Sequence, residues 1–152
     1  MLFRTPPHCL KKNDTPAAST VVSGITSANT VTASDGAVRL SGFVYLQAGK
    51  VYTFGGTFED TLSIEIGGAA VFGFAHDGNN SDTETVSASN YTPGVTGYYS
   101  VEVIQYNVNG NGTGSGFANV TVSIDGAAAV AFDRANIPLY ATAADVTSAT
   151  GA

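Results

Sequence analysis

The chain has 152 residues, of which 43% are hydrophobic and 12% are charged. This length fits one domain of about 100 to 150 residues with tails. With 18 glycines and few Lys, Glu or Leu, the composition favours strands over helices. Twelve acidic residues face six basic ones, and the resulting negative charge argues against a nucleic-acid partner.

The two ends of the chain differ from its middle. Residues 1–19 contain basic side chains and the single cysteine, Cys9, so no intrachain disulfide can form. They lack the apolar run of about 7 to 15 residues found in a signal peptide, and we interpret them as a disordered leader or a junction artefact. Residues 141–152 are small and polar, which is typical of a linker to a following module. No stretch is apolar and long enough to span a bilayer, and we expect no membrane insertion.

Residues 20–140 repeatedly alternate apolar and polar side chains, which predicts half-buried strands. The expected strands are Thr20–Thr32, Val38–Leu46, Lys50–Phe58, Thr61–Ile66, Ala69–Ala75, Thr83–Ser89, Gly97–Tyr106, Asn119–Ile124 and Ala127–Phe132. Gly and Asn or Asp pairs between them mark turns. So many short strands predict a sandwich or barrel of antiparallel sheets, and no segment has a convincing helical period. We expect the following apolar side chains to be buried between the sheets: Leu62, Ile64, Ile66, Val101, Val103, Val120, Val122 and Ile124.

Two acidic residues, Glu59 and Asp60, stand side by side between strand-like runs in a chain with few charges. Neighbouring side chains of an extended strand point to opposite faces, so two such carboxylates would diverge. They could bind one ion only if the backbone departs from extended geometry there, and a cis peptide bond is one way to do so. The alternative is a solvated loop tip without function.

The most irregular region is Tyr106–Phe117, "YNVNGNGTGSGF", in which asparagines and glycines interleave. One interpretation is a long flexible hairpin loop, because loops are commonly rich in these residues. The other is a cation site, since turned carbonyls and Asn side chains supply the neutral oxygens that calcium binds. Together with the acid pair, this loop forms a candidate two-part calcium site.

Other features give weaker signals. His76 and Asp77 lack a third catalytic partner in the sequence, and Asp77-Gly78 reads as a turn, so we expect no enzyme activity. Tyr98, Tyr99 and Tyr106 could form a sugar-stacking face, although alternation places at least one of them inward.

The segments "VYLQAGKVYTFGGTFEDTLSIEIGGAAVFG", "YTPGVTGYYSVEVIQYNVNGNGTG" and "NIPLY" resemble the lectin domain family named after the anthrax protective antigen. The family occurs in yeast flocculins and in giant RTX adhesins of bacteria, and the resemblance covers roughly Val38 to Tyr140. It implies an all-β fold, an antiparallel β-sandwich. In the family, two consecutive aspartates joined by a cis peptide bind calcium, loop residues complete the shell, and the ion coordinates adjacent sugar hydroxyls.

The resemblance implies a site built on Glu59 and Asp60. The expected metal ligands are Glu59, Asp60, Asn107, Asn109, Gly110 and Asn111, and the expected sugar contacts include Glu59, Asp60, Asn109 and Asn111. Tyr91 is a further expected sugar contact, because it precedes the turn in "SNYTPG" and we expect it to be exposed near the site. Asp60 matches the second aspartate of the family, but Glu59 stands where the family has Asp. Its extra methylene changes how closely its carboxylate can approach a shared ion.

The implied function is that of a calcium-dependent lectin module of a large secreted bacterial adhesin, acting in cell adhesion or biofilm formation. Its partners would be cell-surface glycans or monosaccharides, and it would stand among tandem domains and be a monomer when isolated. The alternative is a structural or protein-binding adhesin module that binds no sugar.

Overall fold

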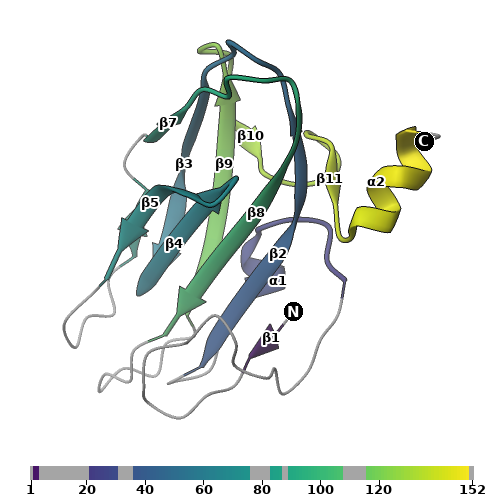
Figure 1. Ribbon diagram of the computed structural model, residues 1–152. Helices are drawn as coiled ribbons and strands as arrows, with labels where there is room; N and C mark the ends of the chain where they lie inside the picture. Colours follow the sequence, from purple (N-terminus) through teal and green to yellow (C-terminus); the bar gives the residue numbers. More distant parts are fainter. Residues whose placement is uncertain are drawn as a thin grey trace.

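The computed structural model describes residues 2–3, 21–30, 36–75, 83–86, 89–107 and 116–150 of the chain. The described residues form two antiparallel sheets that are layered into a β-sandwich (Figure 1). The prediction of an all-β antiparallel sandwich is therefore confirmed. Among these residues no helix is both long and apolar enough to cross a bilayer.

One sheet has six strands and the other has five. The larger sheet has the order β1 (Leu2–Phe3), β2 (Ala37–Leu46), β8 (Gly97–Tyr106), β4 (Thr61–Ile66) and β5 (Ala69–Phe74), with β11 (Leu139–Tyr140) also paired to β2. The smaller sheet has the order β10 (Val130–Ala131), β9 (Phe117–Ile124), β3 (Tyr52–Glu59) and β6 (Glu84–Thr85), with β7 (Ser89–Tyr91) also paired to β3. The run expected as one strand over Thr83–Ser89 thus contributes to two short strands.

The core lies between the inner faces of the two sheets. Of the eight residues predicted to be buried, seven have exposures of at most 8%, and Ile124 is half-buried against the core. Phenylalanines from both sheets fill the centre, with Phe58 and Phe72 in edge-to-face contact at 5.7 Å between ring centroids. Fully burying such a side chain contributes roughly 1.5–3 kcal/mol, so the apolar positions of the alternating strands both define the layers and stabilise them.

The prediction of a strand over Thr20–Thr32 is wrong. In the described part of this range, residues 21–30, the chain makes an isolated bridge at Gly24 and then a short helix, α1 (Ser27–Thr30). Thr30 is fully buried, and its hydroxyl donates to Ala118 O at 2.9 Å and accepts from Ala118 N–H at 2.7 Å. These long-range hydrogen bonds to the start of β9 hold the turn, and they outweigh the β propensity of the local Val and Thr residues.

A second helix, α2 (Ala143–Thr150), occupies most of the segment interpreted as a linker. Its first turn carries a capping box. Thr142 N–H donates to Asp145 Oδ2 at 2.9 Å, and Asp145 N–H donates back to Thr142 Oγ1 at 3.2 Å. This helix was not predicted, because the segment has no convincing helical period, and the Thr-x-x-Asp spacing was the available signal.

Gly56 determines how β3 approaches β9. Its φ is +122°, a conformation that side-chain-bearing residues rarely adopt. A β-carbon built there would lie 1.9 Å from Asn119 O, well inside van der Waals contact. Only glycine fits this close approach of the two strands.

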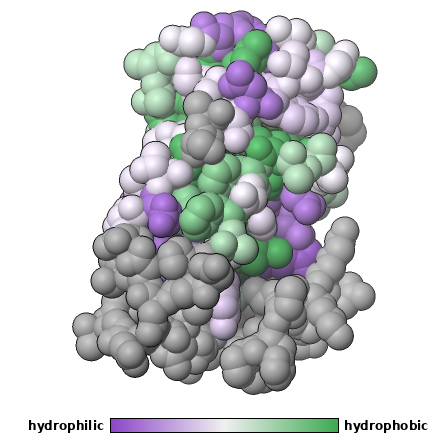
Figure 2. Space-filling view, turned by 90° about the vertical axis from the view of Figure 1, so that its left-hand side faces the viewer, coloured by the Kyte–Doolittle hydropathy of each residue, from purple (hydrophilic) through white to green (hydrophobic). Residues whose placement is uncertain are grey.

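The edge of the sandwich at β5 is apolar. Figure 2 shows hydrophobic side chains gathered at mid-height on this side of the molecule. Phe74 of β5 is 37% exposed there, and its ring lies 5.4 Å from that of the buried Phe58. The edge strand thus continues the core outward to the surface.

Candidate functional site

Glu59 and Asp60 lie where the chain passes from one sheet to the other. Glu59 is the last residue of β3 in the five-stranded sheet, and β4 of the six-stranded sheet begins at Thr61. The peptide bond between Glu59 and Asp60 is cis, which confirms the departure from extended geometry that the ion-binding hypothesis requires. Glu59 is half-buried and Asp60 is only 3% exposed. The pair is therefore no solvated loop tip.

Backbone and side-chain hydrogen bonds hold this crossing against the end of β8. Asp60 N–H donates to Tyr106 O at 3.4 Å, and the Gln105 amide donates to Glu59 O. Gln105 is fully buried. Because Thr61 is opposite Tyr106 in the β4–β8 ladder, Asn107, the residue that follows β8, lies beside Asp60.

The segment rich in Asn and Gly starts and ends next to the acid pair. Asn107, at its start, is buried at 4% exposure and donates its N–H to Gly36 O at 2.9 Å. Phe117, at its end, is paired with Glu59 in the β3–β9 ladder. Asn109, Gly110 and Asn111 lie outside the described residues. The described anchors nevertheless bring both ends of the candidate calcium-binding segment to the two carboxylates.

The electrostatics of the pair reflect the proximity of two like charges. Burial, and then the negative charge of Asp60, raise the pKa of the Glu59 carboxyl above its ordinary value. Two carboxylates and the amide of Asn107 are hard oxygen donors, the class that calcium binds with variable geometry. Within the described ranges no group of three or more His, Cys, Asp or Glu side chains could hold a metal. Further ligands would have to be carbonyls, amides, water or residues outside those ranges.

Tyr91 is not brought to this site. It is opposite Tyr52 at the start of β3, whereas Glu59 is at the end of the same strand. Seven residue steps of a strand span roughly 23 Å. The Tyr91 ring instead packs against Tyr99, 6.0 Å away between centroids, and against the core. A single small sugar at the acid pair therefore cannot reach Tyr91.

The three tyrosines considered as a sugar-stacking face are also separated. Val101, Val103 and Gln105 point inward on β8, so Tyr99 shares their face while Tyr98 and Tyr106 lie on the outer face. Tyr98 contacts Tyr45 and Tyr140, with centroids 5.1 and 5.6 Å away. Tyr98 is at the end of β8 that is remote from Asn107, whereas Tyr106 is the last residue of β8 and directly precedes Asn107. His76 and Asp77 lie outside the described residues.

Gln105 is a site residue that the sequence reasoning missed. It supports the Glu59 carbonyl from a fully buried position. The period of two that predicts Val101 and Val103 as core places Gln105 on the same inward face. A polar side chain at an inward strand position needs a hydrogen-bond partner in the interior, and this was the signal for a supporting role.

Comparisons with solved structures identify similar domains. The chain is similar to the PA14 domain of the antifreeze protein MpAFP, with a TM-score of 0.55 and 31% identity over 70% of this chain and 53% of that one. It is similar to the PA14 sugar-binding domain from an RTX adhesin, with a TM-score of 0.54 and 28% identity over 65% of this chain and 51% of that one. An anti-sigma factor domain-containing protein from Clostridium clariflavum shares the fold, at a TM-score of 0.53 and 14% identity over 69% of this chain and 33% of that one.

The chain thus spans about half the length of the two PA14 structures. No protein-family model and no curated protein matches the sequence.

Proposed function

Because this chain has the fold of a PA14 domain, the protective-antigen type, we propose that it is a calcium-dependent carbohydrate-binding module without catalytic activity. Its parent would be a secreted adhesin at a bacterial cell surface, acting in adhesion or biofilm formation. The observation that carries the proposal is the convergence of Glu59, Asp60 and both anchors of the Asn and Gly segment at one end of the sandwich.

The residues present fit a hard divalent cation. Glu59 and Asp60 would provide the two carboxylates, Asn107 a neutral oxygen, and Asn109, Gly110 and Asn111 are proposed to complete the shell. When bound, calcium would supply open coordination positions for two adjacent sugar hydroxyls. The role of the chain is to hold the two carboxylates together and to keep Asp60 buried, so that the ion is attached to the rigid junction between the sheets.

A shallow site of this kind predicts weak binding of a single sugar, on the order of millimolar to high micromolar. Such affinities become useful when many copies act together at a surface. The similarity to a sugar-binding PA14 domain from an RTX adhesin supports this partner class. The ligands are therefore proposed to be cell-surface glycans with accessible neighbouring hydroxyls.

The test is a glycan array, followed by calorimetry with the best monosaccharide, in calcium and in a chelator. Asp60→Asn keeps the size of the side chain and removes its charge, so binding should disappear in both assays. Glu59→Asp restores the dipeptide expected for the family and should keep or strengthen binding. Binding that persists in chelator, or that survives Asp60→Asn unchanged, would overturn the proposal.

A structural or protein-binding module is the second candidate. Two observations favour it: the similarity to a PA14 domain of an antifreeze protein, and the glutamate at position 59. Under this alternative, calcium would stabilise the domain without any glycan binding. Calcium-dependent stabilisation together with a negative glycan array for both wild type and Glu59→Asp would decide in its favour.

A further inference from the structure

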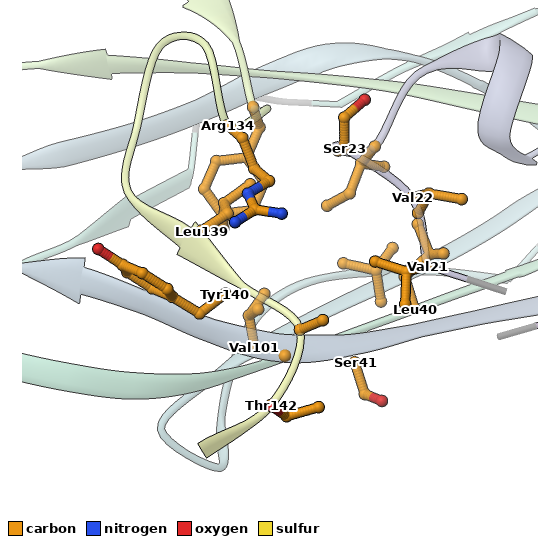
Figure 3. A pocket seen from close by; sticks show the side chains of 16 residues that line it. Val21, Val22, Ser23, Leu40, Ser41, Val101, Arg134, Leu139, Tyr140 and Thr142 are labelled. Atoms are coloured by element: carbon orange, nitrogen blue, oxygen red, sulfur yellow. The ribbon is translucent and has the colours of Figure 1, made fainter. Parts of the chain in front are cut away.

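A cavity of about 230 Å³ enters the layer between the sheets, away from the acid pair. It lies where the segment 21–25, strands β2 and β8, and the chain around β11 meet (Figure 3). Its walls are largely apolar and include Val22, Leu40, Val101, Val103, Phe132 and Leu139. Since Leu40 and Val103 are paired residues on the inner face of the large sheet, the cavity is an opening into the core itself.

One charged side chain faces this opening. Figure 3 shows the guanidinium of Arg134 turned toward the cavity. The Arg134 backbone is fixed by a hydrogen bond from its N–H to Ser23 O at 2.8 Å. Of the basic residues in the described ranges, Arg39 pairs with Glu102 and Lys50 pairs with Asp125, whereas Arg134 has no ion pair there.

The combination of walls and charge indicates the class of ligand. A guanidinium is always charged and binds carboxylates through two parallel hydrogen bonds. A cavity of about 150 Å³ lined by aliphatic and aromatic side chains is large enough for benzene, so this larger one accepts a bulkier apolar group. Sugars need many polar contacts, whereas these walls are largely apolar. We infer that the cavity binds a small amphiphile with one carboxylate and an apolar tail, such as a medium-chain carboxylic acid.

This inference is independent of the proposed function, because neither Glu59 nor Asp60 lines the cavity. Octanoate should therefore bind equally well in calcium and in chelator, and Asp60→Asn should not affect it. Loss of glycan binding would leave the amphiphile site intact. Conversely, the absence of octanoate binding would not affect the calcium site.

The experiment is calorimetry or an NMR titration of the full chain with hexanoate, heptanoate and octanoate below their micelle concentrations, and with octanol. Each added CH₂ should tighten binding about fourfold while the tail fills the cavity. Arg134→Gln should weaken octanoate binding about tenfold and leave octanol unchanged. Lys50→Gln, which also removes a surface cation, is the matched control and should change nothing.

A second variant tests the cavity rather than the charge. Val22→Phe should fill the space from a half-buried position outside the strands and reduce the affinity for both octanoate and octanol. An unchanged melting temperature would show that the fold survives. The inference is overturned if no carboxylate binds at millimolar concentration, if chain length has no effect, or if Lys50→Gln weakens binding as much as Arg134→Gln.

Discussion

The carboxylates at the two ends of strand β3 have opposite electrostatic environments. At its start, Lys50 Nζ lies 2.7 Å from Asp125 Oδ2, and Val51 N–H donates to Asp125 Oδ1 at 2.9 Å. These bonds lower the pKa of Asp125. At its end, Glu59 stands beside Asp60, and burial and the neighbouring charge raise the pKa of Glu59. One end compensates its charge with a neighbouring lysine, whereas the other brings two like charges together, which is the arrangement that our calcium proposal requires.

The largest predicted effect is on calcium affinity, which should depend on the acid pair at the end of β3 and not on Asp125 at its start. Asp60→Asn removes a buried ligand charge, and we expect calcium affinity to fall at least about 100-fold. Asp125→Asn is the matched control at the other end of β3 and should leave the affinity unchanged. Calorimetric titration with calcium measures both. Equal losses in the two variants would mean that calcium responds to overall charge and not to the acid pair.

The next effect is thermal. A cation that binds only the folded state at about 100 times its Kd stabilises by about 2.7 kcal/mol. For a domain of this size the melting temperature should then rise by about 5 to 10 °C on adding calcium to the chelated protein. Scanning calorimetry checks this value, and Asp60→Asn should show no rise. If calcium did not change the melting temperature of the wild type, the acid pair would have only a structural role at the crossing between the sheets.

A pH experiment in chelator sharpens the contrast. The raised pKa of Glu59 means that the folded state holds this proton more tightly than the unfolded state. The contribution of this group to stability is therefore present below its ordinary pKa of 4.5 and is lost as pH rises through the folded value. Relative to wild type, Glu59→Gln should gain melting temperature as pH rises above about 4.5.

At the other end of β3 the sign is reversed. The lowered pKa of Asp125 gives stability that is present above its ordinary value of 3.8 and is lost as pH falls through the folded value. Asp125→Asn should therefore lose melting temperature relative to wild type as pH rises through the folded pKa of Asp125 to about 3.8, and the difference should stay constant at higher pH. If the melting temperatures of both variants, relative to wild type, changed in the same direction with pH, the proposed electrostatic difference between the two ends of β3 would be contradicted.

The smallest effect concerns the exposed ion pair. Lys50→Met removes the cation but keeps the aliphatic stem, and we expect the melting temperature to change by at most about 2 °C, because exposed ion pairs contribute little. Thermal unfolding at low and high salt measures it. A large loss would mean that this end of β3 depends on its charges as much as the acid pair does.

The layers could be predicted from the sequence because alternation is a local signal. Strands β2, β4, β5 and β8 agree with their predicted ranges to within one residue at each end. The structure of the segment before β2 could not be predicted in this way. The buried hydroxyl of Thr30 is hydrogen-bonded to Ala118, which is distant in the chain. Long-range hydrogen bonds of this kind leave no trace in the local composition.

The candidate site was predicted in part. Asp60 and Asn107 directly adjoin the last pair of the β4–β8 ladder, Thr61 and Tyr106, so the structure brings Asn107 to the acid pair. Tyr91 was misplaced because its exposed-looking turn context carries no information about which end of a sheet it occupies, and that depends on the register of β7 against β3. Gln105 was overlooked although its inward position follows from the same alternation that predicts the core.

Gly56 has a consequence for how this protein can change over generations. Every single-base change in a glycine codon that alters the amino acid adds a β-carbon, and here that atom would lie 1.9 Å from Asn119 O. Any such change would push β3 away from β9 just before the strand reaches Glu59. Position 56 is therefore closed to point mutation, and the acid pair can be modified only through its own side chains or through supporting residues such as Gln105.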